Sequence, residues 1–261
     1  HHFFSGFISE VSVLANRNDF SVMIFQSDEN LETEKRNIQA LIDNRVAGVM
    51  ASVSRETTDG SFFQAFSREN IPIVFFDRIP SGAHGAKVTA NNFQGALDAM
   101  NLLIQERRTR IAFITGASHI NVYKSRLEGY RHALAQNNLP FRQEYLIEGG
   151  FLLDDGIEGA RRLTGLTERP DAILAVGDDV AIGAIKYLKS QGIKVPEEIA
   201  VIGFDNDPMG IAIDPELTTV EQPVRMMAGR AWQLLLSAVQ SGNEQQTEEM
   251  LNTRILRRKS C

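Results

Sequence analysis

The 261-residue sequence carries 33 acidic and 27 basic side chains, a formal net charge of −6 at pH 7, and is 43% hydrophobic. This composition is typical of a globular protein with a sizeable core, in one large domain or two smaller ones. The negative charge argues against nucleic-acid binding by this chain itself, and no apolar run is long enough to span a bilayer.

Cysteine usage and the basic tail bear on location and partners. The only cysteine is Cys261, so no internal disulfide can form, and a reducing compartment fits. No signal-peptide pattern opens the sequence, and a cytoplasmic location is therefore expected. The basic cluster Arg257-Arg258-Lys259 is only three residues long, and we expect a solvated tail there instead of a DNA contact.

The first third of the chain alternates between helical and strand-like patterns. Apolar residues at helical spacing predict a first helix whose buried face runs from Phe7 to Ala15. The elements expected after it are a strand at 20–25, a helix around Ile38, a strand at 46–51, a helix at 61–70 and a strand at 71–76. This alternation predicts a parallel sheet with helices on both faces. Because such a sheet should begin with a strand, we expect one further strand, central in the sheet, upstream of His1.

A second series of strand and helix patterns follows a loop at 80–85. Its expected elements are strands at 86–90, 110–115 and 145–148, and helices at 93–105, 125–136 and 155–163. No glycine- or serine-rich linker separates the two series, so we expect a short hinge near Asn91 between two doubly wound α/β domains. A helix at 224–239 and a strand at 250–256 are expected to return to the first domain and to end on the second.

The stretch from Asp171 to Asn206 is the most informative part of the sequence. It predicts a strand at 172–176, a helix that Gly192 and Pro196 terminate, and a strand at 199–203. Asp178 is expected to cap this helix, and Asp178 and Asp205 both follow the carboxyl ends of strands, where open α/β sheets bind ligands. Since no glycine loop that could bind phosphate lies beside them, the two carboxylates favour a neutral polyhydroxyl ligand.

Several motifs, in a fixed order, resemble one protein family over essentially the whole chain. They are HFF, RVAGVMA, IPIVFFDR, SRLEGYRHAL, the stretch from RPDAILAVGDD to VIGFDN, PELTTVEQP and ILRRKSC. Their order and spacing resemble the effector-binding core of bacterial transcription regulators of the lactose-repressor type, the LacI/GalR family. Periplasmic sugar-binding proteins share the fold but usually lack the TTVEQP segment and this tail.

The resemblance implies an architecture and a set of partners. It implies two periplasmic-binding-protein-like subdomains joined by a three-strand hinge, one of residues 1–90 with 223–243 and the other of 91–222 with 247–261. The hinge is expected at Asn91 and Asn92, at Glu221-Gln222, and near Asn243–Thr247. The implied partners are a carbohydrate-like effector, a second copy in a homodimer, and operator DNA through an upstream helix-turn-helix, with no cofactor and no membrane.

Four residues of the second domain are the main candidates for ligand binding. The family places an arginine like Arg126 and a carboxylate like Asp205 against ligand hydroxyls, and a guanidinium offers paired donors to adjacent oxygens. Phe151 matches a position where an aromatic ring faces the ligand, and Asp178 could both accept from hydroxyls and cap its helix. The alternatives are an exposed helix arginine for Arg126, a turn-capping aspartate for Asp205 and core packing for Phe151.

Three candidates come from the first domain. Phe3 and Phe4 could reach the ligand, although the 15 phenylalanines must mostly fill the interior. Arg78 follows a strand end and could either reach the ligand or pair with Asp77 or another acid. If it faces the ligand, two arginines would favour an acidic sugar such as a uronate.

Other functional classes fit less well. The five histidines show no metal-binding spacing, and the sequence has no serine elbow and no Walker loop. Asp178 and Asp205 could mimic a glycosidase pair, but the motif order argues against an enzyme. The alternative function is a periplasmic sugar-binding protein of a transporter, which a signal peptide at the native N-terminus would reveal.

Overall fold

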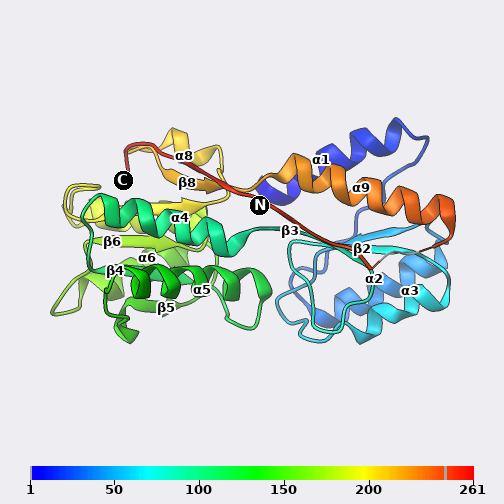
Figure 1. Cartoon of the computed structure of the whole chain (residues 1–261), viewed down its shortest axis with the longest axis horizontal. Helices are drawn as coiled ribbons and strands as arrows, with labels where there is room; N and C mark the ends of the chain where they lie inside the picture. The colour runs from blue at the N-terminus through cyan, green and yellow to red at the C-terminus, as the bar shows by residue number, and fades with distance from the viewer. Residues whose placement is uncertain (1, 244–245) are drawn as a thin grey trace. The chain divides into compact units, whose positions relative to one another are not determined.

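A computed structural model describes residues 2–243 and 246–261 of the chain, which forms two compact units (Figure 1). Unit 1 contains Phe3–Ala90 and Pro223–Leu251, and unit 2 contains Asn91–Gln222 and Asn252–Cys261. The chain therefore passes between the units three times, after Ala90, after Gln222 and after Leu251.

The third passage lies later in the sequence than expected. It was expected near Asn243–Thr247, a range in which residues 244–245 lie outside the described residues. The single strand expected at 250–256 is in fact two strands, β9 (Glu248–Leu251) and β10 (Arg254–Leu256). Because β9 pairs with β3 (Ala86–Ala90) over its whole length, the chain remains part of unit 1 as far as Leu251.

Unit 1 is built on a parallel sheet with the order β1-β2-β3-β9, in which β1 is Val49–Ala51 and β2 is Ile73–Phe76. Helices α1 (His2–Asn16) and α9 (Val224–Ser241) supply one apolar core on one face. Helices α2 (Leu31–Asp43) and α3 (Gln64–Arg68), with the 3-10 turn η1 (Ser61–Phe63), supply a second core on the other face, as Figure 1 shows. The expected α/β class with helices on both faces of a parallel sheet is confirmed.

The strand expected at 20–25 is wrong for this structure. The run Phe20–Phe25 contains no regular strand, and Val22, Met23, Ile24 and Phe25 are all exposed, Ile24 by 57%. A β-strand needs a neighbouring strand to satisfy its backbone groups, and no strand among the described residues pairs with this run or with the outer edge of β1. The composition of the run is typical of a strand but could not supply the neighbouring strand that it needs.

Unit 2 is built on a six-stranded sheet with the order β10-β8-β7-β6-β4-β5, parallel except for β10. The strands are β4 (Ile111–Thr115), β5 (Leu146–Glu148), β6 (Ala172–Ala175), β7 (Ala200–Phe204) and β8 (Thr218–Glu221). Its central strands are fully buried, which explains why they read as continuous apolar runs.

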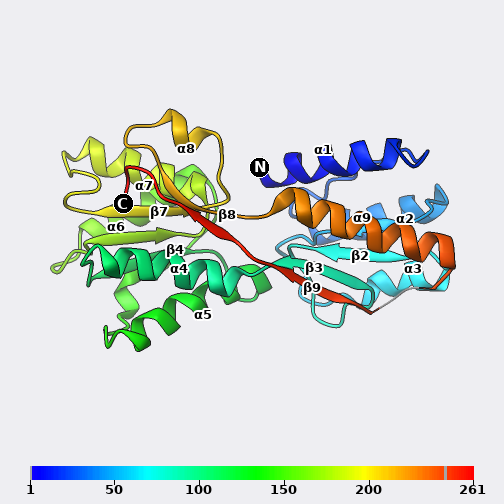
Figure 2. The ribbon, with the colours of Figure 1, turned by 45° about the horizontal axis from the view of Figure 1, so that its top comes forward.

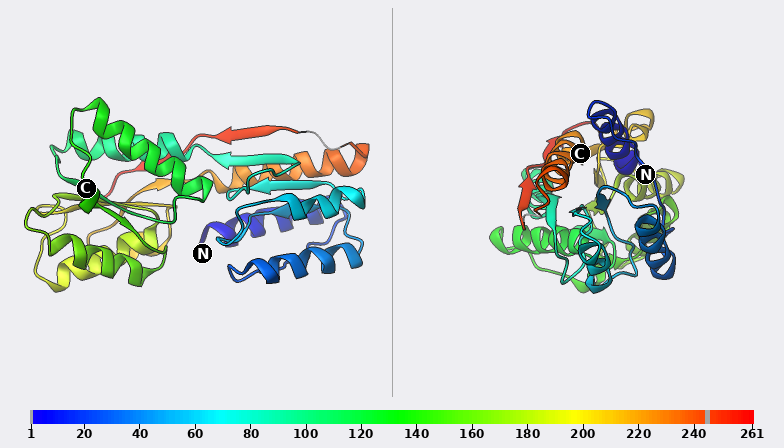
Figure 3. Two further views of the ribbon diagram at one scale, coloured as in Figure 1. Left: turned by 90° about the horizontal axis from the view of Figure 1, so that it is seen from below. Right: turned by 90° about the vertical axis from the view of Figure 1, so that its right-hand side faces the viewer.

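The helices of unit 2 cover both faces of its sheet in two pairs. Figure 2 and Figure 3 show α4 (Asn92–Gln105) and α5 (Asn121–Gln136) together on one face, with α6 (Leu153–Thr164) and α7 (Asp178–Ser190) on the other. Glycines bring the second pair close, because a Cβ at Gly156 or Gly183 would lie 2.0 Å from a carbonyl oxygen of the facing helix. A short helix that was not expected, α8 (Met209–Ala212), lies in the loop between β7 and β8.

Candidate functional site

Arg126 lies buried at the carboxyl edge of the unit 2 sheet. Its position on the inner face of α5 leaves it only 3% exposed, with the guanidinium carbon 3.5 Å from the centre of the Phe204 ring. Its Nε donates to Oδ1 of Asn92 at 2.9 Å, and Nη1 donates to the carbonyl oxygen of Val176, just past the end of β6. The alternative of an exposed helix arginine is therefore wrong.

Asp205 is the carboxylate that faces Arg126. It follows the last residue of β7 and is 8% exposed, and its Oδ1 lies 3.8 Å from Nη2 of Arg126. The same oxygen accepts a hydrogen bond of 2.6 Å from Nε2 of Gln222. Burial raises the pKa of Asp205 to about 6, although Arg126 and the Gln222 hydrogen bond act in the opposite direction. The predicted pairing of an arginine fork and a carboxylate at one edge of the sheet is thus present.

Asp178 lies at the same edge but has an internal role in this structure. Its Oδ1 accepts from the Thr219 hydroxyl at 2.6 Å and its Oδ2 from the backbone N–H of Asp207 at 2.7 Å, and the residue is 1% exposed. It is not the N-cap residue of α7, since that residue is Gly177, and Asp178 lies inside the first turn of the helix. Burial, reinforced by the Asp205 charge, raises its pKa well above the ordinary value. Asp178 therefore joins the turn after β7 to β8.

Two buried polar atoms of this edge have no hydrogen-bond partner among the described residues. They are Oγ1 of Thr115, at the carboxyl end of β4, and Oε1 of Gln222, whose amide nitrogen holds Asp205. Leaving such an atom buried and unpaired costs about 1–3 kcal/mol. Such atoms are also where a polar ligand gains most, because binding can satisfy them.

Two residues assigned to the hinge also belong to this site. Asn92 is the first residue of α4 and accepts the Arg126 hydrogen bond, and Gln222 is the last residue of unit 2 before the second passage to unit 1. Asn91 caps α4 by accepting from the backbone N–H of Gln94 at 3.1 Å. Sequence reasoning missed the contacts of Asn92 and Gln222, because both pairings join segments far apart in the chain.

The aromatic candidates differ in exposure. Phe151 follows β5 at the carboxyl edge of unit 2 and is half-buried against the core of that unit. Phe3 is buried in the unit 1 core, on the same helix stripe as Phe7, and Phe4 packs on Phe3 with ring centres 5.3 Å apart. The structure thus gives Phe3 the core role that the sequence left as its alternative.

Arg78 is engaged by an acid of unit 1, Glu29. Its Nη1 lies 2.8 and 2.9 Å from the two carboxylate oxygens of Glu29, and the arginine is 7% exposed. Glu29 also accepts from the backbone N–H of Arg55 at 2.8 Å. The positive charge of Arg78 is therefore compensated within unit 1.

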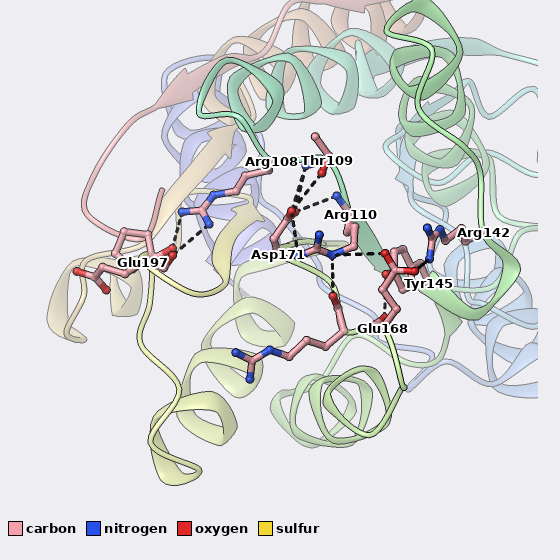
Figure 4. Close-up of polar contacts among 10 residues, drawn as sticks. Arg108, Thr109, Arg110, Arg142, Tyr145, Glu168, Asp171 and Glu197 are labelled. Atoms are coloured by element: carbon pink, nitrogen blue, oxygen red, sulfur yellow. Dashed lines mark hydrogen bonds and ion pairs between the residues drawn. The ribbon is translucent and has the colours of Figure 1, made fainter.

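The opposite, amino-terminal edge of the unit 2 sheet holds a different polar cluster (Figure 4). There Asp171 accepts from the backbone N–H groups of Thr109 and Arg110, at 3.0–3.2 Å. Arg142 pairs with Glu168, and Arg108 donates to the carbonyl oxygen of Glu197 at 3.3 Å. These contacts fasten loops to each other, and their cations are matched by carboxylates or carbonyls.

Comparison with known proteins agrees with the geometry of unit 2. A family model described as a periplasmic binding protein-like domain matches residues 100–261, which is more than half of the chain. The chain is 31% identical to the probable HTH-type transcriptional repressor ExuR of Bacillus subtilis, over 100% of this chain and 76% of that protein. It is 30% identical to the HTH-type transcriptional repressor PurR of Vibrio campbellii, over 91% of this chain and 71% of that protein.

Solved structures extend the likeness to the whole fold. A LacI-family sugar-binding transcriptional regulator from Escherichia coli, complexed with phosphate, superposes with a TM-score of 0.83 at 26% identity, covering 99% of this chain and 92% of that one. The chain belongs to the LacI family of transcription regulators. The transcriptional regulator CelR, solved with cellobiose, gives a TM-score of 0.91 at 26% identity, over 99% of this chain and 79% of that one.

Membership of the LacI family defines the general function. The chain is the effector-binding domain of a LacI-family regulator, and its relatives are transcription regulators, not enzymes. Within the described part of the chain, no helix has both the length and the apolar character needed to cross a bilayer.

Proposed function

We propose that unit 2 binds a carbohydrate-like effector at the carboxyl edge of its sheet, between the Arg126 guanidinium and the Asp205 carboxylate. In this proposal Arg126 donates to ligand oxygens and Asp205 accepts from ligand hydroxyls. Phe151, at the end of β5, packs against the apolar face of the sugar ring, and Asp178 supports the turn that carries Asp205.

The Arg126–Asp205 pair is the observation that carries this proposal. The two groups are buried, oppositely charged and 3.8 Å apart, which leaves them outside normal hydrogen-bond distance of each other. A sugar carries neighbouring hydroxyls that both donate and accept, so it can bond to both groups at once. At the same edge, Thr115 adds a hydroxyl group and Gln222 adds an amide oxygen that can accept a hydrogen bond.

The charge balance favours a neutral sugar over an acidic one. Asp205 compensates Arg126, and Glu29 compensates Arg78, so neither of these two guanidinium groups carries an unmatched charge for a ligand carboxylate. This argues against the uronate that two uncompensated arginines would have favoured. The complex of the similar regulator CelR with cellobiose supports a neutral saccharide as the ligand class.

A thermal-shift panel tests the proposal. We expect at least one neutral mono- or disaccharide, with cellobiose and glucose included, to raise the unfolding temperature more than glucuronate or adenine, because a ligand bound only by the folded state stabilises it. The stabilisation should disappear in Arg126→Ala and Asp205→Ala but persist in Arg131→Ala, an exposed arginine on the same helix. Stabilisation that is retained in both site variants would show that the ligand binds elsewhere.

The regulatory role completes the proposal. Asn92 and Gln222, which bond to Arg126 and Asp205, lie at two of the three passages between the units, so binding at this pair can alter the relation between the units. We further propose that the full-length regulator acts as a homodimer in the cytoplasm and binds operator DNA through its helix-turn-helix. Sedimentation that shows only monomer at tens of micromolar would contradict the dimer.

A further inference from the structure

The turn that carries Asp205 has an unusual backbone. Asp205 has φ of 113° and Asn206 has φ of 56°, so two consecutive residues with side chains lie at positive φ. Asn tolerates the second value, whereas the first is rarely adopted by any residue other than glycine and is strained. Such a turn persists only if its surroundings hold it in place.

Asn206 is held from two sides. Its side-chain nitrogen donates to Oε1 of Glu221 at 2.9 Å, and its side-chain oxygen accepts from Nη2 of Arg258 at 2.7 Å. Glu221 ends β8 and immediately precedes Gln222, the residue that donates to Asp205. The side chain of Asn206 therefore links the C-terminal segment to the strand end that holds the Asp205 carboxylate.

Arg258 is fixed more firmly than a residue of a solvated tail. Its Nη1 donates to the carbonyl oxygen of Leu217 at 2.6 Å, and its backbone N–H donates to the Thr218 hydroxyl at 2.9 Å. Two residues later Ser260 is fully buried and bonds to Val201 of β7 and Thr218 of β8. Figure 1 shows the C-terminus near α8 and β8. The neighbouring Arg257 instead forms a surface ion pair with Glu106.

We propose that Asn206 and Arg258 are positioning residues for the effector site. Arg258 anchors the Asn206 side chain, Asn206 fixes the strained turn against Glu221, and the turn keeps the Asp205 carboxylate on Gln222 and opposite Arg126. Neither residue touches the ligand in this scheme. The predicted effect on ligand affinity rests on the proposed function. The effect of the two residues on the position of Asp205 does not, because it can be measured without ligand.

The deciding experiment follows the Asp205 carboxyl group by NMR in protein labelled with carbon-13 aspartate, with its signal assigned through Asp205→Asn. In the parent chain the group should titrate near pH 6, because it is buried. Arg258→Met should shift this midpoint, because release of the turn changes both the hydration of the carboxylate and its contacts with Arg126 and Gln222, whereas Arg257→Met should leave it unchanged. An unchanged midpoint in Arg258→Met would overturn the proposal.

A second variant separates positioning from loss of stability. Asn206→Gly removes the linking side chain while favouring the positive φ, so the turn loses its anchor without gaining strain. We expect it to shift the Asp205 midpoint in the same direction as Arg258→Met, with thermal unfolding that remains cooperative. If Asn206→Gly titrates like the parent chain, Asn206 has no positioning role.

The consequence for binding is measured with a saccharide that stabilises the parent chain in the panel above. Arg258→Met should weaken its binding about 5–20-fold, while Arg257→Met stays within about twofold. Equal affinities in the two variants would contradict the inference. If no saccharide binds, the proposed function fails, and the NMR titration still decides the positioning role.

Discussion

The Nε atom of Arg126 donates to the Asn92 side chain at 2.9 Å, which ties the guanidinium of the candidate site to the first residue of α4, just after the chain enters unit 2. Arg126 also stacks on Phe204, the residue before Asp205. A single arginine thereby joins α4, α5 and the end of β7. Ligand binding to Arg126 would therefore act on a residue that already contacts the start of unit 2.

The first prediction concerns this arginine. Arg126→Ala should weaken ligand binding by about 1.5–3 kcal/mol, because it removes charge-assisted hydrogen bonds from a desolvated site. Arg126→Lys should recover only part of this, since an ammonium cannot bond to a ligand while also reaching Asn92 and Val176. Calorimetry with the saccharide found in the thermal-shift panel measures both, and Arg131→Ala serves as the control. An Arg126→Ala variant with parental affinity would remove Arg126 from the site.

The strand and helix pattern of unit 2 could be predicted from sequence because its strands are buried on both faces. The run at 172–176 is apolar at every position, and the structure places β6 at Ala172–Ala175, with Asp178 beyond its carboxyl end as expected. The partners of the polar residues could not be predicted in the same way. Nothing local to Gln222 indicates that it faces Asp205, a contact that forms only when β7 and β8 pair.

The second prediction follows from the raised pKa of Asp205. With a folded pKa of about 6 against an ordinary 3.8, the folded state binds more protons than the unfolded state between these values. The contribution of the Asp205 carboxyl group to the free energy of unfolding is therefore largest below pH 4 and falls as the pH rises through 6. Asp205→Asn should remove this fall, of which about 1.4 kcal/mol lies between pH 5 and pH 7.5 and can be measured by urea unfolding at these two values. If the free energy of unfolding depends on pH equally in the parent and the variant, the pKa of Asp205 is not raised.

Ligand binding should show the opposite trend with pH. The ionised carboxylate accepts hydrogen bonds from ligand hydroxyls, whereas the protonated group loses part of this capacity. Affinity for a neutral saccharide should therefore fall as the pH drops below about 6. A titration series by calorimetry tests this, and an affinity that is constant from pH 5 to pH 7.5 would exclude Asp205 as an acceptor.

The third prediction distinguishes the role of Asp178 from that of Asp205. The sequence predicted ligand binding for both residues. Asp178→Ala should lower the free energy of unfolding by about 1–3 kcal/mol, because it leaves the Asp207 N–H and the Thr219 hydroxyl without their acceptor. Since both carboxylate oxygens are engaged internally, ligand affinity should change less than in Asp205→Ala. A variant that unfolds like the parent but does not bind ligand would reverse these roles.

The expectation that failed most clearly, the strand at 20–25, shows a limit of pattern reasoning. Alternation and β-branched residues predict where a chain prefers to be extended, but a strand exists only where a second strand satisfies its backbone. Arg258 illustrates the same limit at the other terminus. A short basic run is typical of a solvated tail, and only the fold reveals that Leu217 and Asn206 accept its hydrogen bonds.

The last prediction concerns the exposed run that includes Met23 and Ile24. An exposed apolar segment rich in β-favouring residues is a template for association between chains, so this chain should aggregate with rising concentration. Met23→Lys with Ile24→Lys should reduce light scattering, because the added charges oppose pairing between chains. The two side chains are 51% and 57% exposed, so the double variant should keep the parental unfolding midpoint. As a matched control, Phe7→Lys places a lysine in the core and should unfold the chain. Unchanged scattering in the double variant would show that association proceeds through another surface.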